Sequence, residues 1–528
     1  MIKERILRET IWFIAACLVI LAFFLMAAPG LAEESGEAND EAFALPDGLT
    51  QVDFLPSSVW IDGTELYYDQ LSGFFFWSIA KEPDHTFQVR ADGFINPNIV
   101  FPENIQTDED IRRNQAKAFI IYDQDIFFQG KIVMTTLPII SLACDNEISD
   151  EYIPMSMRVW DNQQQELKLS NGEIKLRGAT TRFFPKKSFR ISLKKDNGKK
   201  NHVSFLGMRT DDDWILYPAY NDQEKIRNVF CTNLWKETCG YQNSKGVSNG
   251  NEYRFVELFI NDSYWGLYAL GTPLDNKEMF STEYDNEVIF KKEHWSDEYE
   301  ELEDPGVEKL TGYEIYKTKG IYETDEGLCW ELLKKYYVFL VENHSDSAKL
   351  IQRIDVNNFT HLDVFLNMVQ GVDNIELKYH IKNEYLCISD CGDTFYSTMA
   401  PWDLDLTFGN NFSEDPAKNY VIPYAVNPTQ NITFLYGYYG QILLNMDMGL
   451  EVKMDECYQA LRRDAWSDEK INAMLDEYED QIYGSGAYLR DMERWPEGTY
   501  SDPNQGLSIF RHYVLARLKA CDKYYGVK

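Results

Sequence analysis

Two aspartates stand two residues apart in the otherwise uncharged run YSTMAPWDLDLTFGNNF, residues 396–412. Asp403 and Asp405 lie there among apolar and aromatic side chains, where a carboxylate is costly to bury unless its charge is offset. In an extended segment residues i and i+2 face the same way, so both carboxylates can address one point. A hard cation such as Mg²⁺ takes one or two carboxylates together with phosphate oxygens. The run therefore predicts the metal-binding edge of a phosphate site.

A third carboxylate is placed to meet this pair. Asp373 and Asn374 follow a helical pattern, and the strand-like segments 376–383 and 394–401 stand between them and Asp403. If these segments form a hairpin, Asp373 precedes its first strand and the later aspartates follow its second strand, all at one end. A carboxylate several ångströms from the metal can orient or deprotonate the attacking hydroxyl in phosphoryl transfer.

A basic segment could neutralise the phosphate oxygens. Residues 175–200 hold ten lysines and arginines and one acid, Asp196, in a protein of net charge -34. If SFRISL is a strand, Lys186 and Lys187 point to opposite faces, so one of them can enter a cleft and join Arg177 on the phosphates. The alternative is a solvated edge strand on which lysines oppose aggregation.

The elements that would hold these residues fall into successive regions. Residues 1–32 carry basic residues before an uncharged run and predict a signal peptide or signal anchor, and residues 33–42 form an acidic linker. Residues 43–137 show short aromatic and β-branched runs, which predict a small all-β, sandwich-like domain. Residues 138–528 place strand-like segments before helical ones and indicate an α+β domain with a β-rich lobe, a helical lobe and a cleft between them. The main helical segments are 329–342, 357–370, 440–448, 471–482 and 507–525.

Composition limits the classes of function. With 85 acids against 51 basic residues, the surface repels nucleic acid and anionic lipid, and membrane contact is expected only through an uncleaved N-terminal segment. The eight cysteines after residue 32 contain no CxxC pair, which argues against a zinc knuckle or a thioredoxin-type centre. Cys387 and Cys391 fit either a disulfide across a short turn or two free thiols.

Several ordered blocks resemble the CotH family, atypical protein kinases first associated with bacterial spore coats. The blocks are LRGATTRFFPKKSFRISL, YPAYNDQEKIRN, LFINDSYWGLYAL, VDN before a strand, and APWDLDLTFG. The resemblance covers the chain from about residue 138 to its C-terminus. It implies a two-lobed, atypical protein-kinase-like fold in a protein that is secreted or at the cell surface. It further implies that ATP binds with Mg²⁺ or Mn²⁺ between the lobes, and that a Ser or Thr of a cell-surface or spore-coat protein is phosphorylated.

The resemblance also implies roles for single residues. Asp373 matches the catalytic-loop aspartate, the candidate base. Asp403 matches the aspartate that holds the metal, with Asp405 as a second ligand or its support. Trp402 is expected beside the nucleotide. Lys186 and Lys187 match a basic pair expected to contact phosphate.

One position departs from the family pattern. Members commonly place an asparagine about five residues after the loop aspartate, at the start of the next strand, and this sequence has Lys378 there. A protonated lysine cannot ligate a metal, whereas Asn374 could take the place of that asparagine.

Three functions therefore stay open. The first is a secreted Mg-ATP-dependent kinase, or a nucleotide-transferring relative that uses the same site. The second is a catalytically inactive pseudokinase that acts as a surface or spore-coat structural or binding protein. The third is a carbohydrate-active surface protein in which the carboxylate pair serves a glycosidase. The basic segment argues against the third, because neutral glycans need no cationic cradle.

Overall fold

The computed structural model describes residues 48–80, 87–103, 105, 107–178, 180–295, 301–302, 304, 306–343, 346–375, 381–413, 421–430 and 450–527. Residues 48–528 form one compact unit, distinct from residues 1–47. The predicted signal segment, the acidic linker, Lys378 and the helical segment 440–448 lie outside the described residues. In the described part of the chain no helix has the length and apolar character needed to span a membrane.

Two small sheets and one helix make up the N-terminal part of this unit. One sheet has the order β4-β5-β9-β8-β7 with β1 paired to β9, and the other has the order β3-β2-β6. Val59, Phe75, Phe119 and Ile132 are buried in the apolar core of this part. The strand-rich character agrees with the sequence pattern, whereas the short helix α2 was not predicted. The elements are β1 (Thr50–Gln51), β2 (Val59–Ile61), β3 (Thr64–Glu65), β4 (Tyr67–Asp69), β5 (Phe74–Ser78), β6 (Val89–Ala91), β7 (Asn98–Val100), α2 (Thr107–Arg112), β8 (Lys117–Asp123) and β9 (Ile126–Thr135).

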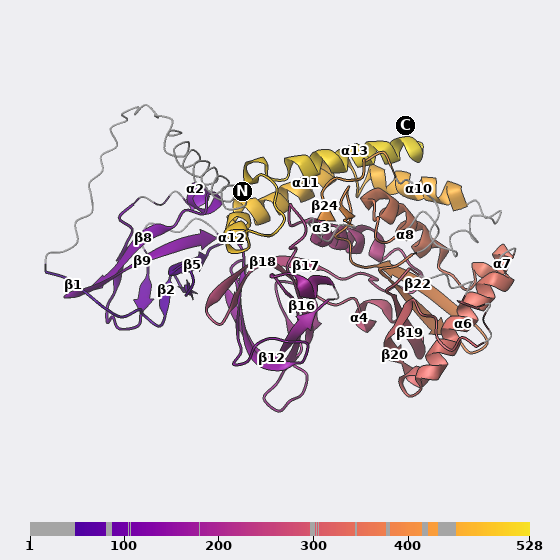
Figure 1. Cartoon of the computed structure of the whole chain (residues 1–528), viewed down its shortest axis with the longest axis horizontal. Coiled ribbons are helices and arrows are strands. Elements are labelled where there is room, and N and C mark those ends of the chain that lie inside the picture. The colour runs from indigo at the N-terminus through magenta and orange to yellow at the C-terminus, as the bar shows by residue number, and fades with distance from the viewer. Residues whose placement is uncertain are drawn as a thin grey trace, which may run out of the picture. The chain divides into compact units, whose positions relative to one another are not determined.

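A closed barrel follows, with the strand order β10-β11-β12-β13-β16-β18-β17 (Figure 1). Alternate residues point inward, and Ile174, Phe189, Ile191 and Leu193 are at most 1% exposed in its core. The tight hairpin between the last two strands of the barrel turns at Asn261–Asp262, both in the left-handed region, as such turns require. The strands are β10 (Ile139–Ala143), β11 (Ile153–Asp161), β12 (Glu166–Arg177), β13 (Ser188–Lys194), β16 (Asp213–Tyr217), β17 (Tyr253–Ile260) and β18 (Ser263–Gly271).

The remaining chain is mainly helical and carries a four-stranded sheet of order β20-β19-β21-β22. Helix α8 packs against α10, α13 and β22, and a large apolar core joins these helices to the sheet. The sheet strands are β19 (Asn286–Lys292), β20 (Tyr313–Lys319), β21 (Glu384–Asp390) and β22 (Phe395–Pro401). The principal helices are α3 (Arg227–Trp235), α6 (Glu326–Glu342), α8 (Val356–Val369), α10 (Leu450–Arg463), α11 (Asp468–Glu479), α12 (Ala487–Arg494) and α13 (Ser508–Tyr524).

The mixed α+β character predicted from the sequence is confirmed. Four of the predicted helical segments coincide with α6, α8, α11 and α13, while α10 and α12 were not predicted. The eight cysteines from Cys144 onward are all free thiols, Cys387 and Cys391 included, so the disulfide alternative is not the one observed.

Candidate functional site

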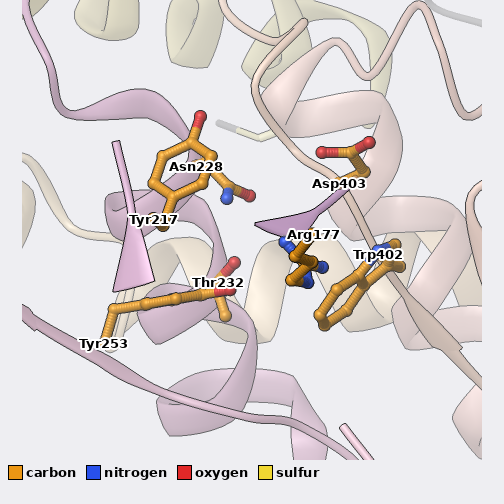
Figure 2. A pocket seen from close by; sticks show the side chains of 7 residues that line it. All are labelled: Arg177, Tyr217, Asn228, Thr232, Tyr253, Trp402 and Asp403. Carbon is orange, nitrogen blue, oxygen red and sulfur yellow. The ribbon is translucent and has the colours of Figure 1, made fainter. Parts of the chain in front are cut away.

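A small pocket opens between barrel strands, helix α3 and the turn that follows β22. Figure 2 shows the side chains that line it: Arg177, Tyr217, Asn228, Thr232, Tyr253, Trp402 and Asp403. Arg177 is the last residue of β12, Tyr217 ends β16 and Tyr253 begins β17. The cavity volume is about 10 Å³, room for roughly one water molecule and far below the roughly 300–1,000 Å³ of typical ligand pockets, so a nucleotide bound here would lie mostly outside it.

The two aspartates of the WDLD segment lie on a turn. The strand ends at Pro401, and Asp403 has a left-handed backbone with φ 56°. The expectation that Asp403 and Asp405 share one face of an extended segment is therefore wrong, because the chain is not extended there. They still act on one another. Burial, and after it the charges of Asp403 and Asp373, raise the pKa of Asp405 well above its usual value.

Helix α3 holds this turn in place. The Leu404 amide donates to Oδ1 of Asn228 at 3.0 Å, and Nε of the buried Arg227 donates to the Thr407 carbonyl at 3.2 Å. Asp222 pairs with Arg227 and fixes its guanidinium. Because the Asn228 oxygen is engaged, its Nδ2 group is the end left to donate into the pocket. The YNDQEKIRN block thus supports the aspartate turn.

Asp373 lies in the loop after α8. Its Oδ1 is 2.7 Å from Nζ of Lys382, and its Oδ2 accepts from Nδ2 of Asn383 at 2.7 Å. Burial raises the pKa of Asp373, Lys382 opposes that rise, and the charge of Asp403 adds to it. The structure therefore brings Asp373 close to Asp403, at the end of a hairpin whose first strand begins at Glu384, after the predicted strand segment 376–383.

Asn374 has a different position from the one expected of a metal ligand. Its Nδ2 donates to the carbonyls of Asn383 at 3.0 Å and Trp402 at 2.9 Å. The side chain is 1% exposed, is not part of the pocket lining, and joins the two ends of the β21–β22 hairpin. This geometry supports a structural role.

Lys186 and Lys187 also differ from expectation. Nζ of Lys186 is fully buried and donates to the carbonyls of Pro218 and Leu267 and to Oδ1 of Asp491, at 2.6–2.7 Å. These three acceptors use all three ammonium hydrogens, which leaves none for a phosphate. Nζ of Lys187 donates to the Arg182 carbonyl at 2.6 Å, near the surface. Neither lysine lines the pocket.

Arg177 does line the pocket. Its guanidinium carbon lies 5.2 Å from the ring centroid of Trp402, and Figure 2 shows the two side chains beside one another near Asp403. With the residues that the structure describes, the guanidinium makes no hydrogen bond or ion pair. Five N–H donors are thus available to an anion, and guanidinium geometry suits phosphate.

Sequence reasoning missed Asn383. The asparagine of the family pattern was expected at the start of the strand after Asp373, and Lys378 was taken to hold that place. Strand β21 begins at Glu384, and the residue before it is Asn383, hydrogen-bonded to Asp373. The loop is simply longer than expected. An asparagine directly before the EYLCISD strand was the signal that could have found it.

A family model described as CotH kinase protein matches residues 174–521, more than half of the chain. The chain belongs to the CotH kinase family. The CotH match begins within β12 and ends within α13, so it contains all the site residues named above. It starts inside the barrel, whose first strand begins at Ile139. A search of the curated proteins finds no match.

A CotH kinase is expected to use a nucleotide and a divalent metal, and the donors present fit such an ion. Asp373, Asp403 and Asp405 supply hard carboxylate oxygens whose mutual repulsion a cation would relieve. Within the described ranges, three residues have potential ligand atoms within 4.8 Å of one another at His202, Asp211 and Asp212. This group does not include the aspartates of the pocket. An ion near Asp403 would therefore be held by one or two carboxylates together with phosphate oxygens, as is usual for Mg²⁺.

Proposed function

We propose that this protein is a secreted or cell-surface kinase that transfers the γ-phosphate of ATP to a Ser or Thr hydroxyl of another protein. In this proposal the barrel is the β-rich lobe, the helical remainder is the second lobe, and the N-terminal two-sheet part is a sandwich-like domain that precedes them. One observation carries the proposal. Asp373 and Asp403 meet at one end of the β21–β22 hairpin, beside the guanidinium of Arg177, which makes no ion pair with the described residues.

Each side chain has a role that its position supports. Asp373 accepts the proton of the attacking hydroxyl, and Lys382 and Asn383 hold its carboxylate in place. Asp403 and Asp405 would hold the metal, with Oδ1 of Asn383 as a further ligand. A divalent ion bound there offsets the negative charge of the β- and γ-phosphates. Arg177 binds phosphate oxygens.

Two other side chains complete the nucleotide site. Nδ2 of Asn228 donates to a phosphate oxygen from the opposite wall of the pocket. Trp402 packs beside the base, a placement that suits a large planar ring already held at the pocket rim.

A labelling experiment tests this function. The full chain is incubated with Mg²⁺ or Mn²⁺ and ATP that carries the label at either the α or the γ position, with dephosphorylated casein and myelin basic protein as acceptors. Protein labelled from γ alone supports the kinase. Label from the α position means nucleotidyl transfer. Nucleotide binding without transfer supports the inactive alternative, which the Lys382–Asp373 ion pair favours because it occupies one oxygen of the base.

Replacing Asn383 by alanine should lower the rate of phosphate transfer about 10–100-fold, because Asp373 loses the amide that orients it and the metal loses a ligand. The rate at saturating ATP is the measurement. Asn197→Ala, at the exposed turn after β13, is the control and should leave this rate unchanged. A transfer rate of wild-type size in Asn383→Ala would remove Asn383 from the site.

A further inference from the structure

Three cations gather on the outer face of strands β12 and β13. Lys175 lies directly opposite Arg190 in the ladder, and Arg177 is two residues further along β12 on the same face. Their neighbours along each strand, Ile174 and Ile191, pair with one another and point into the barrel core. Like charges placed directly opposite one another repel and weaken strand pairing. The row of Lys175, Arg177 and Arg190, called the ladder below, therefore does not favour folding and needs another explanation.

The protein offsets the charge of Arg190 through Asp213 and Glu314 but leaves Lys175 without an ion pair among the described residues. Arg190 pairs with Asp213 at 3.2 Å, but its buried Nε has no hydrogen-bond partner among the described residues. Lys175 makes no ion pair within the described ranges and lies over the ring of Tyr152, 4.6 Å from its centroid. Glu173, the next residue on this face, is already paired with Lys194 at 2.7 Å. The ladder thus keeps an excess of positive charge in a protein of net charge -34.

The place of the ladder indicates which substrate it contacts. Arg177 lines the pocket next to Asp403, whereas Lys175 and Arg190 lie outside the lining. Two strand residues span about 6–7 Å, so Lys175 lies one such step from the phosphate site. In the proposed kinase site, Arg177, Asn228 and a metal already contact the ATP phosphates. An anion bound at Lys175 and Arg190 belongs to a group that approaches the pocket from outside.

We propose that Lys175 and Arg190 dock an acidic side chain of the protein substrate, a carboxylate or a phosphate ester within a few residues of the acceptor hydroxyl. That the docked side chain belongs to a protein substrate rests on the proposed kinase function. The overall negative charge repels an acidic peptide at long range, but screening limits that repulsion to about 8–10 Å at physiological salt. At contact the charge of Lys175 dominates, because Lys175 has no ion-pair partner among the described residues, so acidic residues select the segment that is phosphorylated.

The test compares three labelled serine peptides that are identical except for their flanks, which carry glutamate, glutamine or phosphoserine. Binding of each peptide to the full chain is measured by fluorescence anisotropy with Mg²⁺ and a non-hydrolysable ATP analogue, so that the result does not depend on transfer. Lys175→Glu is the test variant. Lys195→Glu is the matched control, because Lys195 is exposed at the far turn of the same hairpin and the net charge changes equally.

We expect Lys175→Glu to weaken binding of the glutamate peptide at least about tenfold and of the glutamine peptide less than about twofold, with the ATP KM unchanged. Lys195→Glu should behave as wild type. Tighter binding of the phosphoserine peptide than of the glutamate peptide would identify phosphate as the preferred anion. Equal weakening by both substitutions, a raised ATP KM, or no preference of the wild type for acidic peptides overturns the proposal. Acidic-peptide binding without any transfer would instead refute the kinase function and keep the docking site.

Discussion

Replacing Asp403 by asparagine should lower the rate of γ-phosphate transfer at least about 100-fold without unfolding the protein. Asp403 is exposed, its side chain accepts no hydrogen bond within the described part of the chain, and it faces the pocket beside Arg177. Its charge therefore contributes little to the fold. Losing the charge removes a metal ligand at the point where phosphate charge is stabilised, and groups of that kind contribute about 10²–10³ in rate.

The choice of asparagine matters because of the backbone. Asp403 has φ 56°, a conformation that asparagine adopts more readily than alanine. Asp262→Asn is the matched control, since Asp262 is also exposed, has the same φ of 56° and lies at the β17–β18 turn. Transfer is measured with γ-labelled ATP, and stability by urea unfolding. If Asp403→Asn retains the activity of Asp262→Asn, Asp403 does not hold the metal.

Local pattern alone predicted much of the barrel. The segments IISLA and YRFVELFI coincide with β10 and β17 residue for residue, because a run of apolar and β-branched residues bounded by polar turns has few other solutions. Closure of the barrel was not predictable in this way. It depends on the parallel pairing of Ile139 with Glu257, and no local pattern encodes a contact between segments so far apart.

The site shows the same difference between local structure and structure that depends on distant contacts. The approach of Asp373 to Asp403 was expected from a hairpin, which is a local structure, but the first strand of the observed hairpin begins at Glu384, after the predicted segment 376–383. The left-handed turn at Asp403 and the position of Asn383 depend on loop length, which composition does not reveal. Lys186 was expected to contact a phosphate in a cleft or to lie on a solvated edge strand, because a lysine is seldom fully buried. Its partner Asp491 stands 305 residues later in the chain, so no local pattern could indicate their contact.

That contact carries the largest expected effect on stability. Replacing Asp491 by alanine should lower the free energy of unfolding by about 3–5 kcal/mol, because the buried ammonium of Lys186 is left without a counter-ion. Both side chains are 0% exposed. Asp491 also accepts hydrogen bonds from the Leu267 amide at 2.9 Å and the Tyr500 hydroxyl at 3.0 Å, so the variant loses these bonds as well.

The pH dependence of this variant has a defined sign. Burial lowers the pKa of Lys186, and Asp491 partly opposes that shift. Without Asp491 the folded-state pKa falls further below the unfolded value, so the unfolded chain binds more protons and stability rises with pH. The deficit of Asp491→Ala relative to wild type should therefore be smaller at pH 9 than at pH 7. A deficit that is the same at both values would mean that the lost hydrogen bonds, and not the buried charge, cause it.

The double substitution Lys186→Met with Asp491→Leu separates structure from function. Apolar residues of similar size leave no buried charge, so most of the lost stability should return. Since Lys186 has three protein acceptors and no opening to the pocket, ATP affinity of the folded double variant should stay within about threefold of wild type. A direct contact between Lys186 and a phosphate predicts a loss of at least about tenfold, because charge-assisted hydrogen bonds contribute about 1.5–3 kcal/mol each. ATP titration by calorimetry decides between the two roles.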